Sequence, residues 1–206
     1  MSATRLRTTI AAALAVAAMT SLSACGSSTT AGSAAVVGNQ EVPDVAVAQL
    51  TDELQRQLQS VKGFTYDPAK GTSETVLRLT TSLLLHEAAK REGIVVTPSQ
   101  VDQVLTANSA GTGGRAALDT ALAQRSSVPA SAVDSFAEDF LIGQALRQKI
   151  APSSADQGAK ALNDYLGKLS AELGTKIAPR YGTWDPKNST IGPVPGDLAS
   201  GLTATG

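Results

Sequence analysis

The feature that most constrains the fold is a long run of helical apolar spacing between residues 72 and 92. Its apolar residues recur every three or four positions and form two adjoining stripes, Val76, Leu79 and Leu83 beside Leu77, Leu84 and Ala88. Stripes that together are this wide are typical of a helix that is packed on two sides. Thr72 is the predicted N-cap, and Gly93 stands at the position favoured for a left-handed helix end. The sequence therefore predicts a central helix with neighbours on more than one face.

Weaker apolar stripes predict five further helices. Their expected bounds are 44–61, 98–108, 115–124, 130–150 and 154–173, with loops at 62–71 and 109–114. The start at residue 98 is the best defined, because Thr97, Pro98 and Gln100 match a capping box with proline in the first turn. Aromatic residues make up only 3% of the chain and charged residues 17%. Alanine and leucine must therefore carry most of the packing.

A small β element is predicted from two segments, one before and one after the predicted helices. Residues 34–42 read as a strand, a tight turn at Gly38-Asn39 and a short return strand. A two-stranded hairpin of this size is marginal in water, so its strand needs a second partner. The extended apolar segment 175–181, after a helix stop at Gly174, is placed to supply it. We expect a mainly α fold in which the N-terminal strand pairs with this C-terminal segment, followed by an irregular tail over 182–206. Trp184 in that tail is expected to fold back onto the body.

The N-terminus carries the marks of an export signal. Arg5 and Arg7 are the only charges in the first 24 residues, and the apolar run at 10–19 is followed by Leu22-Ser23-Ala24-Cys25. A positive start, a short apolar run and small residues before a cut site are typical of a secretory signal peptide. A run of about 10 residues is too short to span a bilayer, which takes roughly 20. We therefore predict a signal peptide over residues 1–24.

The four residues that end this segment resemble the lipobox of bacterial lipoproteins. The resemblance implies that the sulfur of Cys25, the only cysteine, receives diacylglycerol and that the chain is cut before it. Lipid on Cys25 would hold the protein at the extracytoplasmic face of the cell membrane, since two acyl chains anchor stably where one does not. Residues 25–33, which are mostly small and polar, are predicted to be a flexible tether.

Composition limits what the mature chain can do. The removed segment holds two arginines and no acid, so the formal charge of −1 becomes −3 after cleavage. Nucleic-acid binding would call for a basic face, which such a balance does not favour. One cysteine allows no disulfide within the chain. The remaining 182 residues suit one domain with a real core.

Two motifs that carry chemistry in other proteins lack their context here. His86 is the only histidine, and its neighbour Glu87 does not face it on a helix, so neither a catalytic histidine nor a zinc site is favoured. Residues 111–116 fit a dinucleotide fingerprint by letter, but that fingerprint needs a preceding strand, and the preceding segment is predicted helical. We expect no enzyme activity, no nucleotide and no cofactor.

The order of parts resembles the N-terminal chaperone region of the SurA and PrsA family of periplasmic foldases. Three stretches carry the resemblance, AAVVGNQEVPDVAVAQL, LLLHEAAKREGIVVTPSQVDQVL and FLIGQALRQKIAP. Together they cover about residues 34–152, and 34–181 is the predicted SurA-like helical domain. Full foldases of this family carry a parvulin prolyl isomerase after such a lobe. Here one predicted helix occupies that place, and the parvulin histidines are absent.

The resemblance implies an ATP-independent, chaperone-like binder of unfolded or extended exported polypeptides. An apolar groove between helices would capture these clients, and Phe64 and Tyr66 in the 62–71 loop are the candidate client-binding residues. The alternative is an accessory or structural lipoprotein that binds one specific envelope partner and has no general chaperone activity. Suppression of aggregation of several unrelated clients would distinguish the two.

Overall fold

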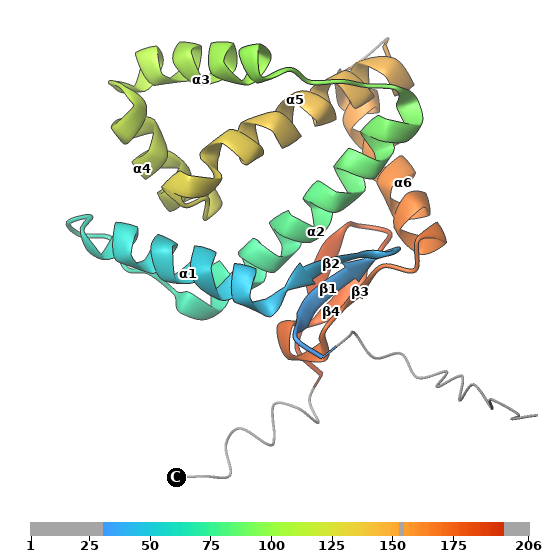
Figure 1. Cartoon of the computed structure of the whole chain (residues 1–206), viewed down its shortest axis with the longest axis horizontal. Helices are drawn as coiled ribbons and strands as arrows, with labels where there is room; N and C mark the ends of the chain where they lie inside the picture. The colour runs from blue at the N-terminus through green and yellow to red at the C-terminus, as the bar shows by residue number, and fades with distance from the viewer. Residues whose placement is uncertain (1–30, 153–154, 196–206) are drawn as a thin grey trace, which may run out of the picture.

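The computed structural model describes residues 31–152 and 155–195. Within these ranges the chain forms six α-helices and five short strands (Figure 1). The helices are α1 Asp44–Gln59, α2 Pro68–Glu92, α3 Pro98–Thr112, α4 Arg115–Ser126, α5 Val133–Ile150 and α6 Ala155–Glu172. The strands are β1 Ser33–Val37, β2 Gln40–Pro43, β3 Lys176–Ile177, β4 Thr183–Asp185 and β5 Thr190–Gly192. The predicted mainly α fold with a small β element is confirmed.

Helix α2 runs through the middle of the molecule, with α5 on one side and the sheet on the other (Figure 1). It also contacts α1 and α6. Val76, Leu84 and Ala88 on this helix are fully buried. Val76 belongs to a cluster with the strands, whereas Leu84 and Ala88 belong to one with α5 and α6. The predicted packing on two sides is therefore confirmed.

The start of α2 differs from the prediction, which placed the N-cap at Thr72. The N-cap is Asp67, whose Oδ1 accepts hydrogen bonds from the backbone N–H groups of Ala69 at 3.0 Å and Lys70 at 3.2 Å. Pro68 occupies the first turn, where its missing N–H costs nothing. Thr72 lies inside the helix, and its hydroxyl donates to the Pro68 carbonyl at 2.8 Å. The end at Gly93 is as predicted, because Gly93 has φ of +64° and closes the helix.

Helix α3 begins as predicted and ends later than predicted. Thr97 Oγ1 accepts from the Gln100 N–H, and the Gln100 side chain accepts from the Thr97 N–H at 2.8 Å, which completes the capping box. The expected stop near Asn108 is wrong, because the helix continues to Thr112 and ends at Gly113. The side chains of Asn108 and Thr112 each donate to the carbonyl four residues earlier, so polar residues continue the helix instead of ending it.

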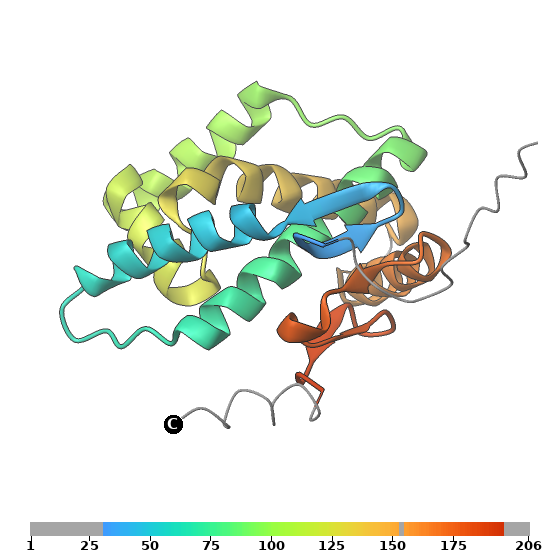
Figure 2. The same ribbon diagram turned by 60° about the horizontal axis from the view of Figure 1, so that its bottom comes forward.

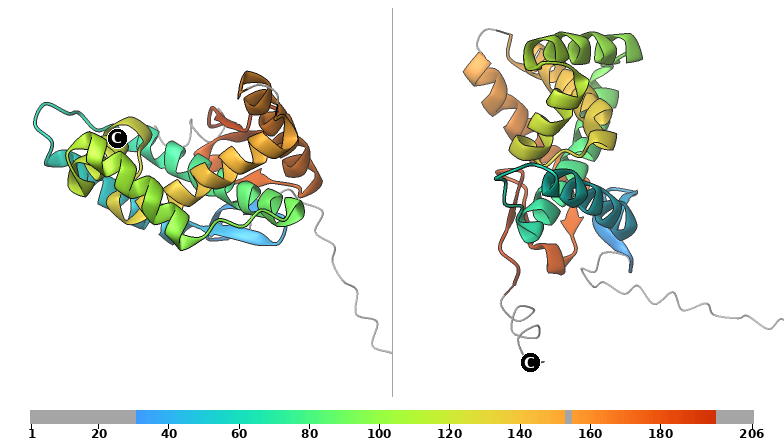
Figure 3. Two further views of the ribbon diagram at one scale, coloured as in Figure 1. Left: turned by 90° about the horizontal axis from the view of Figure 1, so that it is seen from above. Right: turned by 90° about the vertical axis from the view of Figure 1, so that its left-hand side faces the viewer.

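The last two helices flank α2. The predicted helix from residue 130 begins as a 3-10 turn, Ala130–Ala132, and continues as α5. One helix, α6, lies between α5 and β3, as expected from the length of that segment. Its predicted cap, Ser154, lies outside the described residues. The right panel of Figure 3 shows α3, α4 and α5 at one end of the molecule and the strands toward the other.

The two ends of the body meet in a three-stranded antiparallel sheet of order β2-β1-β3. Val36 pairs with Glu41 on β2 and with Lys176 on β3. The backbone N–H of Ala178 donates to the Ala34 carbonyl at 2.8 Å beyond the last strand pair. The predicted pairing of the N-terminal strand with a C-terminal segment is confirmed. Ser33, expected at the end of the tether, is already part of β1 and is buried.

Residues 183–192 form a second sheet where we expected an irregular tail. Strands β4 and β5 pair from Thr183 with Gly192 to Asp185 with Thr190. Figure 2 shows this hairpin beside α6 and the three-stranded sheet. Trp184 packs against the core, and its Nε1 donates to Ser170 Oγ on α6 at 2.6 Å. The tryptophan thus folds back onto the body as predicted, and it brings an ordered hairpin with it.

Candidate client-binding groove

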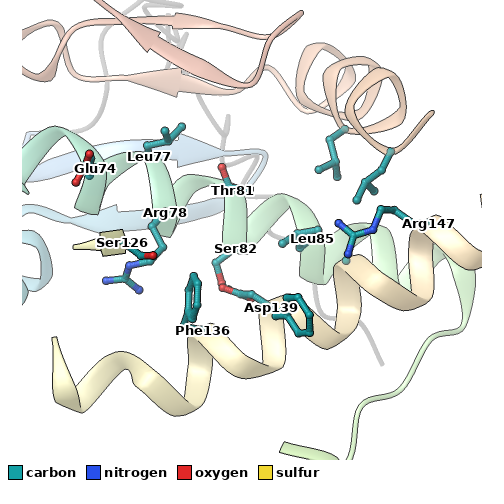
Figure 4. A pocket seen from close by; sticks show the side chains of 14 residues that line it. Glu74, Leu77, Arg78, Thr81, Ser82, Leu85, Ser126, Phe136, Asp139 and Arg147 are labelled. Carbon is teal, nitrogen blue, oxygen red and sulfur yellow. The ribbon is translucent and has the colours of Figure 1, made fainter. Parts of the chain in front are cut away.

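An open groove of about 450 Å³ lies between α2, α5 and α6. Most of its wall is apolar, and Figure 4 shows the side chains of α2 and α5 that converge on it. The apolar side chains come from all three helices and comprise Leu77, Leu85, Phe136, Phe140, Leu162 and Leu166. We call this hollow the client groove. It is large enough to take a few apolar side chains of a partner.

Phe136 and Phe140 form a ridge on α5 beside this groove. They are four residues apart, so their side chains share one helix face. Phe140 is 48% exposed, and few other large apolar residues in the described ranges are exposed to this extent. Both residues also line a second hollow of about 190 Å³ between α3, α4 and α5. A single pair of aromatic side chains therefore separates two apolar hollows.

A buried carboxylate lies on the floor of the groove. Asp139 on α5 is 8% exposed, and its Oδ1 accepts a hydrogen bond from Ser82 Oγ at 2.9 Å. His86 Nε2 approaches the same oxygen at 3.2 Å. Burial raises the pKa of Asp139 above its usual 3.8, against the opposing effects of the Ser82 hydrogen bond, His86 and Arg78.

The order of these three groups bears on catalysis. In a hydrolytic triad the histidine lies between the nucleophile and the carboxylate, so that it can take the hydroxyl proton. Here the carboxylate of Asp139 lies between Ser82 and His86. The hydroxyl of Ser82 therefore donates directly to the carboxylate and not to the histidine. This order does not match that of a Ser-His-Asp triad.

Arg78 is a second charged residue that lines the groove. It lies on α2, one turn before Ser82, and lines the groove. Burial lowers the pKa of its guanidinium, and the charge of Asp139 opposes this effect. Its Nε and Nη2 are buried, and no acceptor within the described part of the chain reaches them. The groove therefore combines apolar walls with a guanidinium, two of whose nitrogens have no acceptor among the described residues.

A comparison with known families decides where this fold belongs. A family model of SurA-like N-terminal domains matches residues 3–150, well over half of the chain. The chain belongs to this family. SurA-like N-terminal domains are chaperone-like and in general non-catalytic, so the resemblance seen in the sequence is confirmed. No curated protein and no solved structure matched the chain.

The family match ends with α5, and the C-terminal segment beyond it packs against the matched part of the chain. Helix α6 supplies Leu162 and Leu166 to the groove wall. Strand β3 completes the sheet, and the Gly38 N–H donates to the Leu173 carbonyl at 3.1 Å. This segment therefore contributes both to the groove and to the core.

The two predicted client-binding residues of this SurA-like domain lie away from the groove. Phe64 and Tyr66 pack on a cluster formed by Leu54, Leu58 and Ala123. Both line a separate hollow of about 200 Å³ beside α4. The Tyr66 hydroxyl abuts the backbone of α2, where a Cβ built on Gly71 would lie 2.1 Å away. The structure thus separates these residues from the client groove, and their role in binding stays a prediction.

The remaining motifs noted in the sequence are the dinucleotide-like segment and the N-terminal export signal. Residues 111–116 span the end of α3 and the start of α4, and the preceding element is a helix, without the strand of a dinucleotide fingerprint. Cys25, the signal peptide and most of the tether lie outside the described residues. In the described ranges no helix could cross a bilayer, and no cluster of three potential metal ligands occurs.

Sequence reasoning missed Phe140, Asp139 and Arg78. All three lie within predicted helices. Helical periodicity does not show which side of a helix other elements leave uncovered, so it could not mark these residues as part of a groove. Asp139 was the one with a detectable signal, since a carboxylate on the same helical face as Phe136 and Gly143 interrupts an apolar stripe.

Proposed function

We propose that this SurA-like domain binds extended, unfolded segments of exported polypeptides in the client groove, without ATP and without catalysis. The observation that carries the proposal is the half-exposed Phe140 on the ridge between two apolar hollows. Exposed apolar surface rimmed by polar groups marks binding sites in soluble domains. Membership of the SurA-like family supports a chaperone-like role.

The shape of the groove suits clients with varied sequences. An extended chain advances about 3.3 Å per residue and points alternate side chains to one face. Apolar side chains entering the groove would bury surface at about 25 cal/mol per Å², a driving force that does not depend on exact side-chain shape. A groove open on one side does not enclose its ligand. Weak, sequence-tolerant capture is the expected behaviour.

Suppression of aggregation tests this function. The full-length protein, purified in detergent, is added to several unrelated chemically unfolded clients, and light scattering is followed. We expect the wild type to lower scattering for each client and Phe140→Ser to lose most of that effect. Val45→Ser is the matched control, because Val45 is 61% exposed on α1 and does not line the groove. Equal activity of wild type and Phe140→Ser would rule out the groove as the client site.

The same assay addresses the alternative of a lipoprotein with one fixed partner. Such a protein would leave scattering unchanged for all unrelated clients. It would instead be recovered with a single envelope protein after crosslinking in cells. That pair of results would replace the chaperone-like function with the accessory one.

We also propose that lipid on Cys25 holds the protein at the extracytoplasmic face of the membrane. The Leu22–Cys25 motif and the absence of any other cysteine in the sequence support this anchor. Metabolic labelling with a fatty acid tests it. Wild type should take up label and Cys25→Ser should not, and equal label in both would disprove the lipid attachment.

A further inference from the structure

The guanidinium of Arg78 in the client groove carries hydrogen-bond donors that are not paired with an acceptor in the described part of the chain. Within the described ranges, its Nε and Nη2 are buried with no hydrogen-bond partner. Buried polar groups in native proteins are nearly always satisfied, so an unpaired one calls for an explanation such as a ligand. The need is greatest for a charged donor, because its hydration is lost on burial.

The carboxylates that share the groove are already engaged. Asp139 accepts the hydroxyl of Ser82 and receives His86 on the same oxygen. Glu74 accepts the hydroxyl of Ser127 and lies 3.7 Å from the ammonium group of Lys70. Neither acid supplies a hydrogen bond to Arg78. Within the described part of the chain, the groove therefore has a guanidinium that feels the charge of Asp139 but has no hydrogen-bond acceptor for its Nε and Nη2.

A second cation lies at the other end of the groove. Figure 4 shows Arg147 on α5 near one end and Arg78 near the other, with Leu85 and Phe136 between them. Among the described residues Arg147 makes no ion pair. With Glu74 paired to Lys70, the groove holds two arginines and one remaining carboxylate, Asp139, so its net charge is positive although the chain is net negative. Charge complementarity selects an anionic partner over a neutral or cationic one.

We infer that the client groove selects apolar peptide segments that carry a carboxylate, and that this carboxylate pairs with the guanidinium of Arg78. The inference rests on the proposed function and names the class of segment that the groove prefers. Arginine and a carboxylate can form two parallel hydrogen bonds, a geometry that a lysine or a neutral acceptor does not reproduce. The apolar side chains of the same segment would lie against Phe136 and Leu85. An aspartate or glutamate side chain and a free C-terminus offer the same acceptor.

Three fluorescent peptides with one apolar sequence test the preference by anisotropy on the full-length protein in detergent. The first carries an internal glutamate and an amidated C-terminus, the second has glutamine in its place, and the third is the glutamine peptide with a free C-terminus. We expect at least one carboxylate peptide to bind on the order of tenfold more tightly than the neutral one at low salt. Which of the two does so identifies the source of the carboxylate.

Variants assign the preference to its residue. Arg78→Gln should reduce the advantage of the carboxylate peptide to below about twofold, as expected when a charge-assisted pair is lost. Arg56→Gln is the matched control, since Arg56 is exposed on α1 and its loss changes the net charge equally. If Arg78→Gln folds poorly, the comparison of the three peptides on the wild type still decides whether the groove prefers a carboxylate. Arg78→Lys keeps the charge but cannot form two parallel hydrogen bonds, so it should retain only part of the preference.

The outcomes separate the two proposals. Equal binding of all three peptides by the wild type would overturn the carboxylate preference and leave the proposed function standing. A preference that persists in Arg78→Gln would overturn the assignment to Arg78. A wild-type protein that binds none of the peptides would overturn the proposed function, and the preference with it.

Discussion

Leu84 is the residue on which the central helix depends most clearly. It is fully buried between α5 and α6, in a cluster that includes Leu146 and Leu166. Leu84→Ala removes buried methyl groups and leaves a cavity that its rigid neighbours cannot fill. We expect a loss of roughly 2–5 kcal/mol in the free energy of unfolding, measured by urea denaturation.

Val95→Ala is the control for that substitution. Val95 lies in the link between α2 and α3 and is 79% exposed, so its truncation should change stability by less than about 0.5 kcal/mol. A Leu84→Ala protein as stable as the control would show that α2 is not packed on two sides.

Asp139 makes stability depend on pH in a direction opposite to most carboxylates. Burial raises its pKa in the folded state above the usual 3.8, so the folded state holds the proton over a range where the unfolded state has lost it. Stability therefore falls as pH rises from about the unfolded pKa through the folded one. Arg78 and His86, which oppose the shift, and Glu138, which adds to it, are the other charged groups that act on Asp139.

Asp139→Asn should remove this dependence. Its free energy of unfolding, relative to that of the wild type, should increase as pH rises from about 3 to about 7. Urea denaturation across that range measures the difference between the two proteins, in which the titration of other groups cancels. Asp102→Asn on the exposed side of α3 is the control. A constant difference between wild type and Asp139→Asn at every pH would contradict the raised pKa.

At the level of single residues, the sequence predicts which apolar side chains are buried better than it predicts which of them stay exposed. Leu84 was predictable because it lies in the middle of a wide apolar stripe. Phe140 has the same signal, yet it is half exposed, because the helices around it in the described part of the chain leave an open hollow on either side of it. Contacts such as that between Asp139 and Ser82, which are 57 residues apart, depend on how helices pair in space. No local pattern encodes them.

The β4–β5 hairpin depends on a close approach to α6. A Cβ added at Gly167 would lie 2.6 Å from the Pro186 carbonyl oxygen in the hairpin turn. Gly167→Ala should therefore push the hairpin away and cost roughly 1–3 kcal/mol, as overpacking does. Trp184 is the only tryptophan, so its fluorescence reports the change directly. We expect a shift of its emission to longer wavelength, together with a lower midpoint of unfolding.

Gly111→Ala is the matched control for this prediction. Gly111 lies within α3, and a Cβ there meets nothing within 4 Å. Alanine is the better helix former by roughly 0.5–1 kcal/mol, so this variant should be as stable as the wild type or slightly more so. Unaltered emission and stability in Gly167→Ala would mean that the hairpin does not lie on α6.

Elements with local signals were predictable, and elements held by distant contacts were not. The start of α3 follows from Thr97, Pro98 and Gln100, all within one turn. The hairpin was missed because its strands are three residues long and are stabilised by Trp184 against α6 instead of by their own propensity. The pairing of β1 with β3 was found by a different route, since a lone short hairpin would have left backbone groups unpaired.

Ending the chain at Gly174 tests how the whole molecule is closed. It removes β3 and the hairpin, and with them the hydrogen bond from the Ala178 N–H to the Ala34 carbonyl. We expect lower stability and loss of protection of the Val36–Gly38 amides in hydrogen exchange. Protection of the α3 amides serves as the internal reference. Unchanged exchange at Val36–Gly38 would show that β1 is held by β2 alone.

The partners in the central sheet are also synthesised at different times. Val36 pairs with Lys176, and a ribosome that adds about 5–20 residues per second needs roughly 7–28 s to travel between them. During that interval β1 has one neighbour, and its other edge is open to any extended chain nearby. Until β3 has been synthesised, this protein therefore resembles the unfolded chains that we propose it binds. It could itself be bound by a chaperone during that interval.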